Sequence, residues 1–361
     1  MALFDGHNGP AMSDFLCDHL VEYVASAISK LPQQYELSGF LDIHNDDDSS
    51  SDSSAIPADD IVSDTIKQAF KEVDDVMIDV SEVLSSPSKT NAVRTLRHAH
   101  SGSCALMSVY DVDTRILRVA LTGDSRAVLG RKVSSKNGKT DAYEVHLLSY
   151  DQNAHNPKEV ARLEAEHPGE EVVKNGRVMG WGMARAFGDA AYKWSVDIQE
   201  QLYEKYLGDR VRSNMKTPPY LTAEPEITTT RVQKGDFIIM ASDGLWDCLT
   251  SEEAVGLVGV WLANNIDSVY TDSPVKDFAK KRSKDDKVYT RDELPLKVPL
   301  EKVDDENDET LYYPWWHATK QFVNRDSSAA AHLARNALGG ADSDLTEALV
   351  SLAHPRARKY R

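Results

Sequence analysis

Residues 101–130 read SGSCALMSVYDVDTRILRVALTGDSRAVLG, and this stretch decides the fold class of the 361-residue chain. Short apolar runs occur at 104–110, 116–121 and 126–130, with Asp-rich turns between them. Runs of this length between turn residues are typical of a meander of antiparallel strands. Further strands are predicted at 145–148 and 236–241, the latter as a buried strand because its apolar residues are consecutive.

Segments with helical periodicity precede and follow these strands. Apolar residues recur at helical spacing from Pro10 to Leu31, which predicts a helix with proline in its first turn. The same reasoning predicts helices at 61–84, 157–167, 251–264, 327–338 and 343–352. Because helices come before and after a block of strands, we expect an α+β sandwich and not a βαβ array.

The composition is that of an ordinary globular protein with an excess of acidic residues. Apolar residues make up 41% of the chain, and the formal net charge is −17. This balance argues against a nucleic-acid partner, which needs clustered Lys and Arg. No apolar run approaches the ~18 residues that a membrane span requires. Cys17, Cys104 and Cys248 form no metal or disulfide spacing, so we expect them to be reduced and buried.

Two segments are predicted to lie outside the packed domain. Residues 41–62 are acidic and Ser-rich, and we interpret them as a disordered loop. Residues 266–310 are strongly charged and low in apolar content, which indicates an insertion or mobile loop. Either segment could contact a partner, although solvated loops without such a role are the commoner case. No internal repeat is seen, and one domain is predicted over 1–361.

Three acidic turns carry the chemistry of the sequence. Each follows an apolar run directly, which would place its carboxylate at the end of a strand: Phe4-Asp5-Gly6-His7, Thr122-Gly123-Asp124-Ser125-Arg126 and Ala241-Ser242-Asp243-Gly244-Leu245-Trp246-Asp247. Such clusters suit hard cations, Mg²⁺ or Mn²⁺, completed by water. A single Asp-Gly is far more often an ordinary turn, so only the joint pattern is informative.

The joint pattern resembles the type 2C (PPM) serine/threonine protein phosphatases through nearly the whole chain. Six motifs match in order: Phe4–Gly9, Ser101–Ala105, Thr122–Ala127, Arg185–Asp189, Leu221–Glu226 and Ala241–Asp247. The resemblance is closest to the pyruvate dehydrogenase phosphatase branch. It rests on Glu166–Gly169, Lys193–Ser195, Thr217–Glu226, Tyr312–Trp316 and Asn336–Gly340. It implies the family fold, a central antiparallel β-sandwich flanked by pairs of antiparallel helices.

The resemblance also assigns roles to individual residues. Asp5 is expected to bridge two catalytic Mg²⁺ or Mn²⁺ ions, the Gly6 carbonyl to bind one of them, and Asp243 to bind the other. His7 is expected to be the general acid that protonates the leaving oxygen, although an isolated His after Gly is more often a surface residue. The resemblance further implies that water activated by the metals would attack phosphorus, without a covalent intermediate.

Other motif residues have less central roles in this reading. Asp124 and Asp247, together with Asp243, match a third and weaker metal site, with a helix cap or a solvated acid as the alternative for Asp247. Arg185 and Asp189 are expected to be structural, as a brace between a strand and a turn. The serines at 101, 103 and 125 are not expected to be nucleophiles, because no His-Asp pairing is suggested for them.

Compared with the family pattern, we expect both ends to be cut short. Only four residues precede Asp5, whereas family members carry an upstream strand with a phosphate-binding Arg and an acidic pair. The pattern also continues beyond Arg361 into a second acidic pair and a core strand. We therefore expect a fragment with missing edge strands, which would bind catalytic metal poorly, derived from an active parent protein.

Two functions from different classes follow from this reading. The first is a metal-dependent phosphatase acting on a phosphoprotein, with the E1 component of pyruvate dehydrogenase as the substrate that the branch implies. The second is a catalytically inactive binding or regulatory protein that keeps the fold. An unrelated metal-dependent hydrolase is a third reading that the ordered motifs disfavour. The branch implies a mitochondrial location, with the cytoplasm as the alternative.

Overall fold

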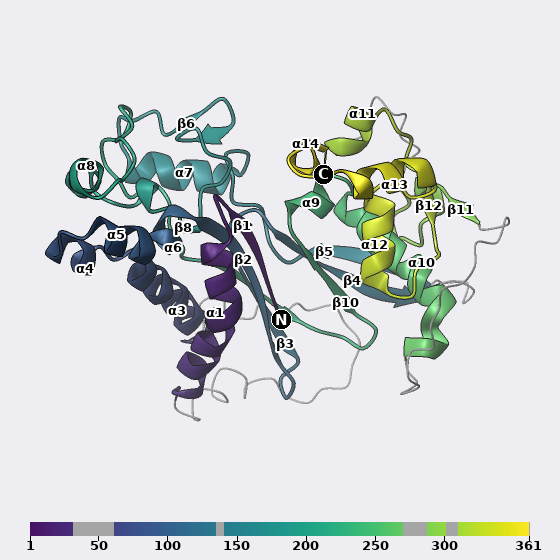
Figure 1. Cartoon of the computed structure of the whole chain (residues 1–361). Helices are drawn as coiled ribbons and strands as arrows, with labels where there is room; N and C mark the ends of the chain where they lie inside the picture. The colour runs from purple at the N-terminus through teal and green to yellow at the C-terminus, as the bar shows by residue number, and fades with distance from the viewer. Residues whose placement is uncertain (32–60, 135–140, 270–286, 301–309, 361) are drawn as a thin grey trace. The chain divides into compact units, whose positions relative to one another are not determined.

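The computed structural model describes residues 1–31, 61–134, 141–269, 287–300 and 310–360. The chain divides into two compact units. Unit 1 comprises Met1–Arg126 and Leu148–Val232, and unit 2 comprises Ala127–Leu147 and Gln233–Arg361. The α+β class with antiparallel sheets, predicted from the sequence, is confirmed (Figure 1). The prediction of one domain over 1–361 stays a prediction.

Unit 1 is built on a five-stranded sheet with the order β1-β2-β3-β9, and the short β8 pairs with Gly102 and Ser103 of β2 on the edge opposite β1. Every pairing in it is antiparallel. The strands are β1 (Ala2–His7), β2 (Gly102–Asp111), β3 (Ile116–Thr122), β8 (Phe187–Gly188) and β9 (Glu226–Arg231). All seven residues of β3 are buried, as expected for a central strand.

Two long helices, α1 (Ala11–Ser29) and α3 (Ile61–Ile78), lie beside each other against this sheet (Figure 1). The apolar residues of α1 follow an i, i+4 spacing, which gives one buried stripe. That stripe packs with α3 and with apolar side chains of β2 and β3, and its members are Met12, Leu16, Leu20 and Val24. Phe70 of α3 contacts Phe187 of β8, with ring centroids 5.3 Å apart.

Shorter elements complete unit 1. Asn156 caps the start of α7 by accepting a hydrogen bond from the Lys158 amide, and Pro157 opens the helix, a favoured combination. These elements are α4 (Ser81–Ser85), α5 (Lys89–Thr95), α6 (Arg97–His100), α7 (Pro157–Glu166), β6 (Val173–Lys174), β7 (Arg177–Val178), the 3₁₀ helix η1 (Ala190–Tyr192) and α8 (Val196–Lys205).

Unit 2 contains a three-stranded sheet with the order β10-β4-β5 and a small β11-β12 ribbon. Side-chain caps fix the starts of two of its helices: Ser328 caps α12, and Asp342 caps α13. The strands are β4 (Arg126–Ser134), β5 (Asp141–Leu147), β10 (Phe237–Ala241), β11 (Val288–Tyr289) and β12 (Phe322–Val323). The helices are α9 (Asp243–Trp246), α10 (Ser251–Val269), η2 (Arg291–Glu293), α11 (Tyr312–Trp316), α12 (Ala329–Ala337), α13 (Ser343–Ser351) and α14 (Ala357–Tyr360).

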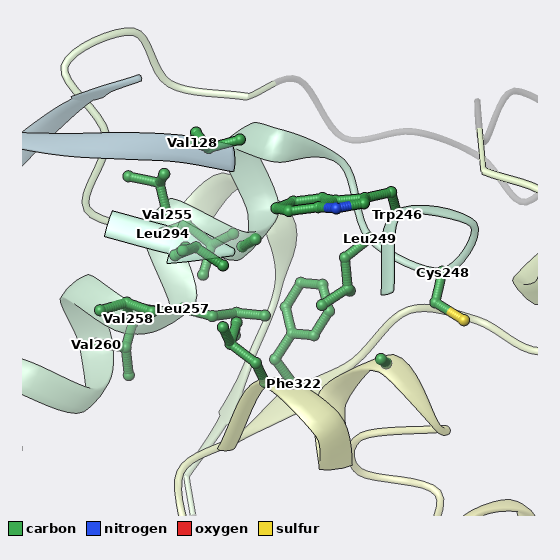
Figure 2. Packing of buried hydrophobic residues seen from close by; sticks show 14 of the residues in the cluster. Val128, Trp246, Cys248, Leu249, Val255, Leu257, Val258, Val260, Leu294 and Phe322 are labelled. Atoms are coloured by element: carbon green, nitrogen blue, oxygen red, sulfur yellow. The ribbon is translucent and has the colours of Figure 1, made fainter. Parts of the chain in front are cut away.

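The core of unit 2 forms around the apolar side of α10. Figure 2 shows Val255, Leu257 and Val258 of α10 together with Trp246 and Phe322 from other parts of the unit. Residues far apart in sequence therefore share one buried cluster. None of the described helices of the protein has both the length and the apolar character needed to cross a membrane.

The structure corrects the predicted meander at its third strand. β4 does not pair with β3, because β9 occupies the edge of β3 that β2 leaves open. The chain turns out of the first sheet at Gly123, whose φ of +114° suits glycine. β4 then pairs with β5 and β10 in unit 2. β9 and α8 were not predicted.

Three further differences concern segment ends and burial. The helix predicted at 61–84 is broken after Ile78, because the Asp79 carboxylate accepts hydrogen bonds from the backbone and hydroxyl of Ser81 and starts α4. Most of the predicted loop 41–62 lies outside the described residues, but Ile61 already belongs to α3. Cys104 and Cys248 are buried as predicted, whereas Cys17 is exposed, because it lies beside the buried stripe of α1 and not within it.

The predicted insertion 266–310 lies partly outside the described residues. Its first four residues, 266–269, still belong to α10, and its longest described part, residues 287–300, carries β11 and η2 and contributes Leu294 and Leu296 to the core of unit 2. Arg291 also forms an ion pair with the fully buried Glu253 of α10, at 2.6 Å. This portion is therefore packed structure, despite its high charge.

Candidate active site

The β1–β2 ladder positions the first acidic motif. Asp5, Gly6 and His7 lie opposite Cys104, Ser103 and Gly102 in register. These three motif residues belong to the strand and not to the turn predicted for them, because the backbone pairing continues through His7. The turn comes next, where Asn8 and Gly9 have positive φ angles.

His7 is held by a buried carboxylate. Its Nε2 lies 2.5 Å from Oδ2 of Asp189, whose side chain is 2% exposed. The Asn8 side-chain amide donates to the other oxygen of the same carboxylate at 3.3 Å. The Trp181 ring lies 5.3 Å from the imidazole ring, centroid to centroid. The imidazole thus has a fixed anionic partner and an aromatic neighbour.

The glycine at 102 leaves the space in which this pair meets. A Cβ atom on Gly102 would stand 2.6 Å from the carboxyl carbon of Asp189, and it would also overlap the His7 ring. Real Cβ atoms do not approach other atoms so closely. The Gly in the Ser101–Ala105 motif therefore has a steric role in the candidate site.

Asp5 and Asp124 face the same buried thiol. Asp5 pairs directly with Cys104 across the ladder, so their side chains lie on one face of the sheet. The Cys104 thiol donates to Oδ1 of Asp124 at 3.1 Å. Burial raises the pKa of this thiol well above its usual range, and the charges of Asp124 and Asp5 add to the effect. The two carboxylates therefore converge at one end of β2 and β3.

The second pair of predicted ligands belongs to unit 2. Asp243 is the first residue of α9 and is exposed, and the Asp247 amide donates to the Asp243 carbonyl at 2.7 Å. Burial raises the pKa of the Tyr312 phenol, and the negative charges of Asp247, Cys248 and Asp243 raise it further. Both carboxylates are therefore near the same phenol, on one turn of helix.

The donor set of each unit has the chemistry of a hard-cation site. Unit 1 offers the carboxylates of Asp5 and Asp124 and the carbonyl of Gly6, an exposed residue, and unit 2 offers Asp243 and Asp247. Within the described residues, no three His, Cys, Asp or Glu side chains form a group that could hold an ion. Mg²⁺ is commonly held by one or two carboxylates and several waters, so these oxygen donors fit such a cation.

Arg185 and Asp189 differ from each other in what they contact. Arg185 is a buried brace, as predicted: it binds Glu159 of α7 at 2.6 Å and donates to the Glu224 carbonyl at 2.8 Å. Asp189 was predicted to be structural but contacts His7. The sequence signal for it was the Gly188-Asp189 pair after Phe187, which resembles an ordinary turn. Trp181 carried no signal at all.

Comparison with known proteins gives consistent matches. The profile of the family Protein phosphatase 2C matches residues 1–288. A protein phosphatase 2C homologue of Schizosaccharomyces pombe is 39% identical over 365 residues, which cover 99% of this chain and 70% of that protein. The mitochondrial pyruvate dehydrogenase (acetyl-transferring) phosphatase 1 of Saccharomyces cerevisiae is 35% identical over 370 residues, covering 99% and 59%.

The matches at lower sequence identity cover a smaller share of this chain. The human mitochondrial pyruvate dehydrogenase phosphatase 1 is 34% identical over 308 residues, covering 73% of this chain and 56% of that protein. Among solved structures, a serine-threonine phosphatase 2C from Toxoplasma gondii has a TM-score of 0.44 at 20% identity and covers 73% of each chain. The chain thus spans about 56–70% of the length of these three curated relatives.

Proposed function

The chain belongs to the protein phosphatase 2C family, and we propose that the protein containing it hydrolyses phosphoserine and phosphothreonine in other proteins with the help of Mg²⁺ or Mn²⁺. The observation that carries this proposal is the His7–Asp189 pair, 2.5 Å apart, next to Asp5 on the same strand. His7, which can donate a proton, and Asp5, which can bind a metal ion, therefore lie on the same strand.

His7 is suited to protonate the leaving serine or threonine oxygen. Asp189 accepts from Nε2, so Nδ1 is the nitrogen left to give a proton to substrate. The buried carboxylate also fixes the orientation of the imidazole ring, which a general acid must aim at the leaving oxygen. Its second oxygen is engaged by Asn8, which keeps the carboxylate in one orientation.

Asp5, the Gly6 carbonyl, Asp124, Asp243 and Asp247 are the residues proposed to hold the metal ions. When bound, such ions supply an activated water and neutralise charge on the phosphoryl oxygens. The Cys104–Asp124 hydrogen bond and the Ser103 hydroxyl, which donates to the Asp5 carbonyl at 3.2 Å, would orient the ligands of unit 1.

For the substrate we propose the pyruvate dehydrogenase complex, and for the location the mitochondrion. The support is that several relatives at 34–35% identity are named as mitochondrial pyruvate dehydrogenase phosphatases. The fission-yeast relative at 39% identity carries only the family name. A phosphopeptide copied from the pyruvate dehydrogenase E1 component should therefore be a better substrate than the same peptide with its residues scrambled around the phosphoserine.

The ligand role of Asp5 can be tested by phosphate release from that peptide over a series of Mn²⁺ concentrations. Asp5→Asn should raise the Mn²⁺ concentration for half-maximal activity by more than the roughly 10–100-fold known for loss of an outer-shell partner. Asp113→Asn, in the exposed β2–β3 turn, is the matched control. An unchanged Mn²⁺ requirement in Asp5→Asn would remove Asp5 from the ligand set. A protein that binds the phosphopeptide without turnover would favour the inactive regulatory reading.

A further inference from the structure

We propose that Asp74 and Lys193 are positioning residues that orient His7 through Asp189. This inference rests on the proposed function, because it concerns the delivery of a proton by His7. Asp74 lies on α3 and Lys193 follows η1, and neither residue belongs to a motif assigned to the chemistry. The two side chains are 6% and 5% exposed, and they form an ion pair at 2.5 Å.

The carboxylate of Asp74 holds the backbone immediately before Asp189. Its Oδ1 accepts a hydrogen bond from the Gly188 amide at 2.8 Å, while its Oδ2 binds the Lys193 ammonium. Both oxygens are therefore used, one on the backbone and one on a charge. A buried carboxylate with two such partners has a single favoured orientation.

Lys193 holds the other side of the same turn. Besides Asp74, its ammonium donates to the Ala186 carbonyl at 2.7 Å. The ion pair consequently binds the main chain at 186 and at 188, with Phe187 between them. Two anchor points two residues apart restrain both the position and the direction of the strand end that leads into Asp189.

The turn itself needs such restraint. Gly188 has φ +65°, and Asp189 has φ 46° and ψ 40°, in the left-handed region. That conformation is uncommon for a residue with a side chain and persists where the surroundings impose it. The Asp189 amide also donates to the Ser101 carbonyl at 3.0 Å. These contacts together direct the Asp189 carboxylate at His7.

A purely structural role makes a different prediction. Removing one partner of a buried ion pair destabilises a protein whether or not a site is near. That effect would lower the activity on every substrate alike. Misorientation of His7 would instead affect only reactions in which the leaving oxygen needs a proton. The dependence on leaving group therefore separates the two roles.

The experiment compares phosphate release from a phosphoserine peptide with that from p-nitrophenyl phosphate, at saturating Mn²⁺, in the full-length protein. The alkoxide of serine is a poor leaving group, and the nitrophenolate needs no proton. In Asp74→Asn and Lys193→Met we expect kcat for the peptide to fall at least about tenfold more than kcat for the aryl ester, within the 10²–10⁴-fold reach of general acid catalysis. His7→Asn and Asp189→Asn should show the same split.

Two controls keep the test decisive. Lys193→Arg keeps the charge and should restore the wild-type ratio of the two rates. Asp236→Asn breaks another ion pair whose carboxylate is 2% exposed, with Arg131 of unit 2, and should not change the ratio. Equal losses on both substrates in Asp74→Asn and Lys193→Met would overturn the inference. A wild-type protein inactive on both substrates would overturn the proposed function instead.

Discussion

The fully buried His332 of α12 should make the stability of the protein fall as the pH drops below neutrality. The His332 Nε2–H donates to the Leu257 carbonyl at 3.1 Å, and the side-chain Nδ2 of Asn336 lies 3.3 Å from the His332 Nδ1. If Nδ1 of His332 were protonated as well, its N–H would face the side-chain NH₂ group of Asn336, which is also a donor. Burial lowers the pKa of His332 to about 4, because the pull of the Asp326 carboxylate does not compensate for desolvation and Arg335 adds to the repulsion.

The sign and the size of this pH effect follow from the different pKa values of His332 in the folded and the unfolded chain. The unfolded chain takes up a proton on this ring near the usual pKa of 6.5, whereas the folded chain does so only near 4. The ring's contribution to stability is therefore fully present above pH 6.5 and is lost as the pH falls toward 4. At 1.36 kcal/mol per pH unit the full loss is about 3 kcal/mol. About 2 kcal/mol of it should be lost between pH 7 and pH 5.

Urea unfolding at pH 7 and pH 5 measures this directly. His332→Gln is expected to be less stable than wild type at pH 7 but to lose about 2 kcal/mol less free energy of unfolding on going to pH 5. The exposed His155 provides the control, because His155→Gln should keep the wild-type pH dependence. The reasoning is refuted if wild type and His332→Gln lose the same free energy over this interval.

Two further substitutions test the candidate site and its support. Gly102→Ala should reduce turnover of a phosphoserine peptide by at least about 10²-fold, the lower range for loss of an acid catalyst, because the new methyl group would displace His7 from Asp189; near-normal turnover would contradict that geometry. Glu159→Gln should lower the free energy of unfolding by about 3 kcal/mol, because it removes the carboxylate that the buried Arg185 contacts at 2.6 Å and leaves only Glu226, at 3.9 Å. A change below about 1 kcal/mol in urea unfolding would show that the pair is dispensable.

Periodicity predicted most of the elements well, because most helices and strands here have one apolar face. The helix from Pro10 to Leu31 matches α1 within two residues at each end. The runs at 104–110 and 116–121 match β2 and β3. The same patterns could not show that β4 joins a different sheet, since strand pairing depends on which edges other strands already occupy. Here the strand that occupies the free edge of β3 is β9, which lies more than 100 residues further along the chain.

The candidate site was predictable to the extent that its residues lie in motifs. Asp5 and Asp124 were both named from the motifs, and both lie near Cys104; their roles as metal ligands stay predictions. Asp189 was assigned a structural role because its neighbours in sequence suggest only a turn. Its contact with His7 spans 182 positions in the chain, and a pairing of that kind arises from the β1–β2–β8 register and not from local spacing.

The central claim is tested most directly by metal-dependent release of phosphate from a phosphoserine peptide. We would assay the protein that contains this chain with and without millimolar Mn²⁺ or Mg²⁺. The account predicts turnover that depends on the added metal. Turnover that persists unchanged without metal would contradict the proposed metal dependence, and no turnover at any metal concentration would contradict the proposed phosphatase activity.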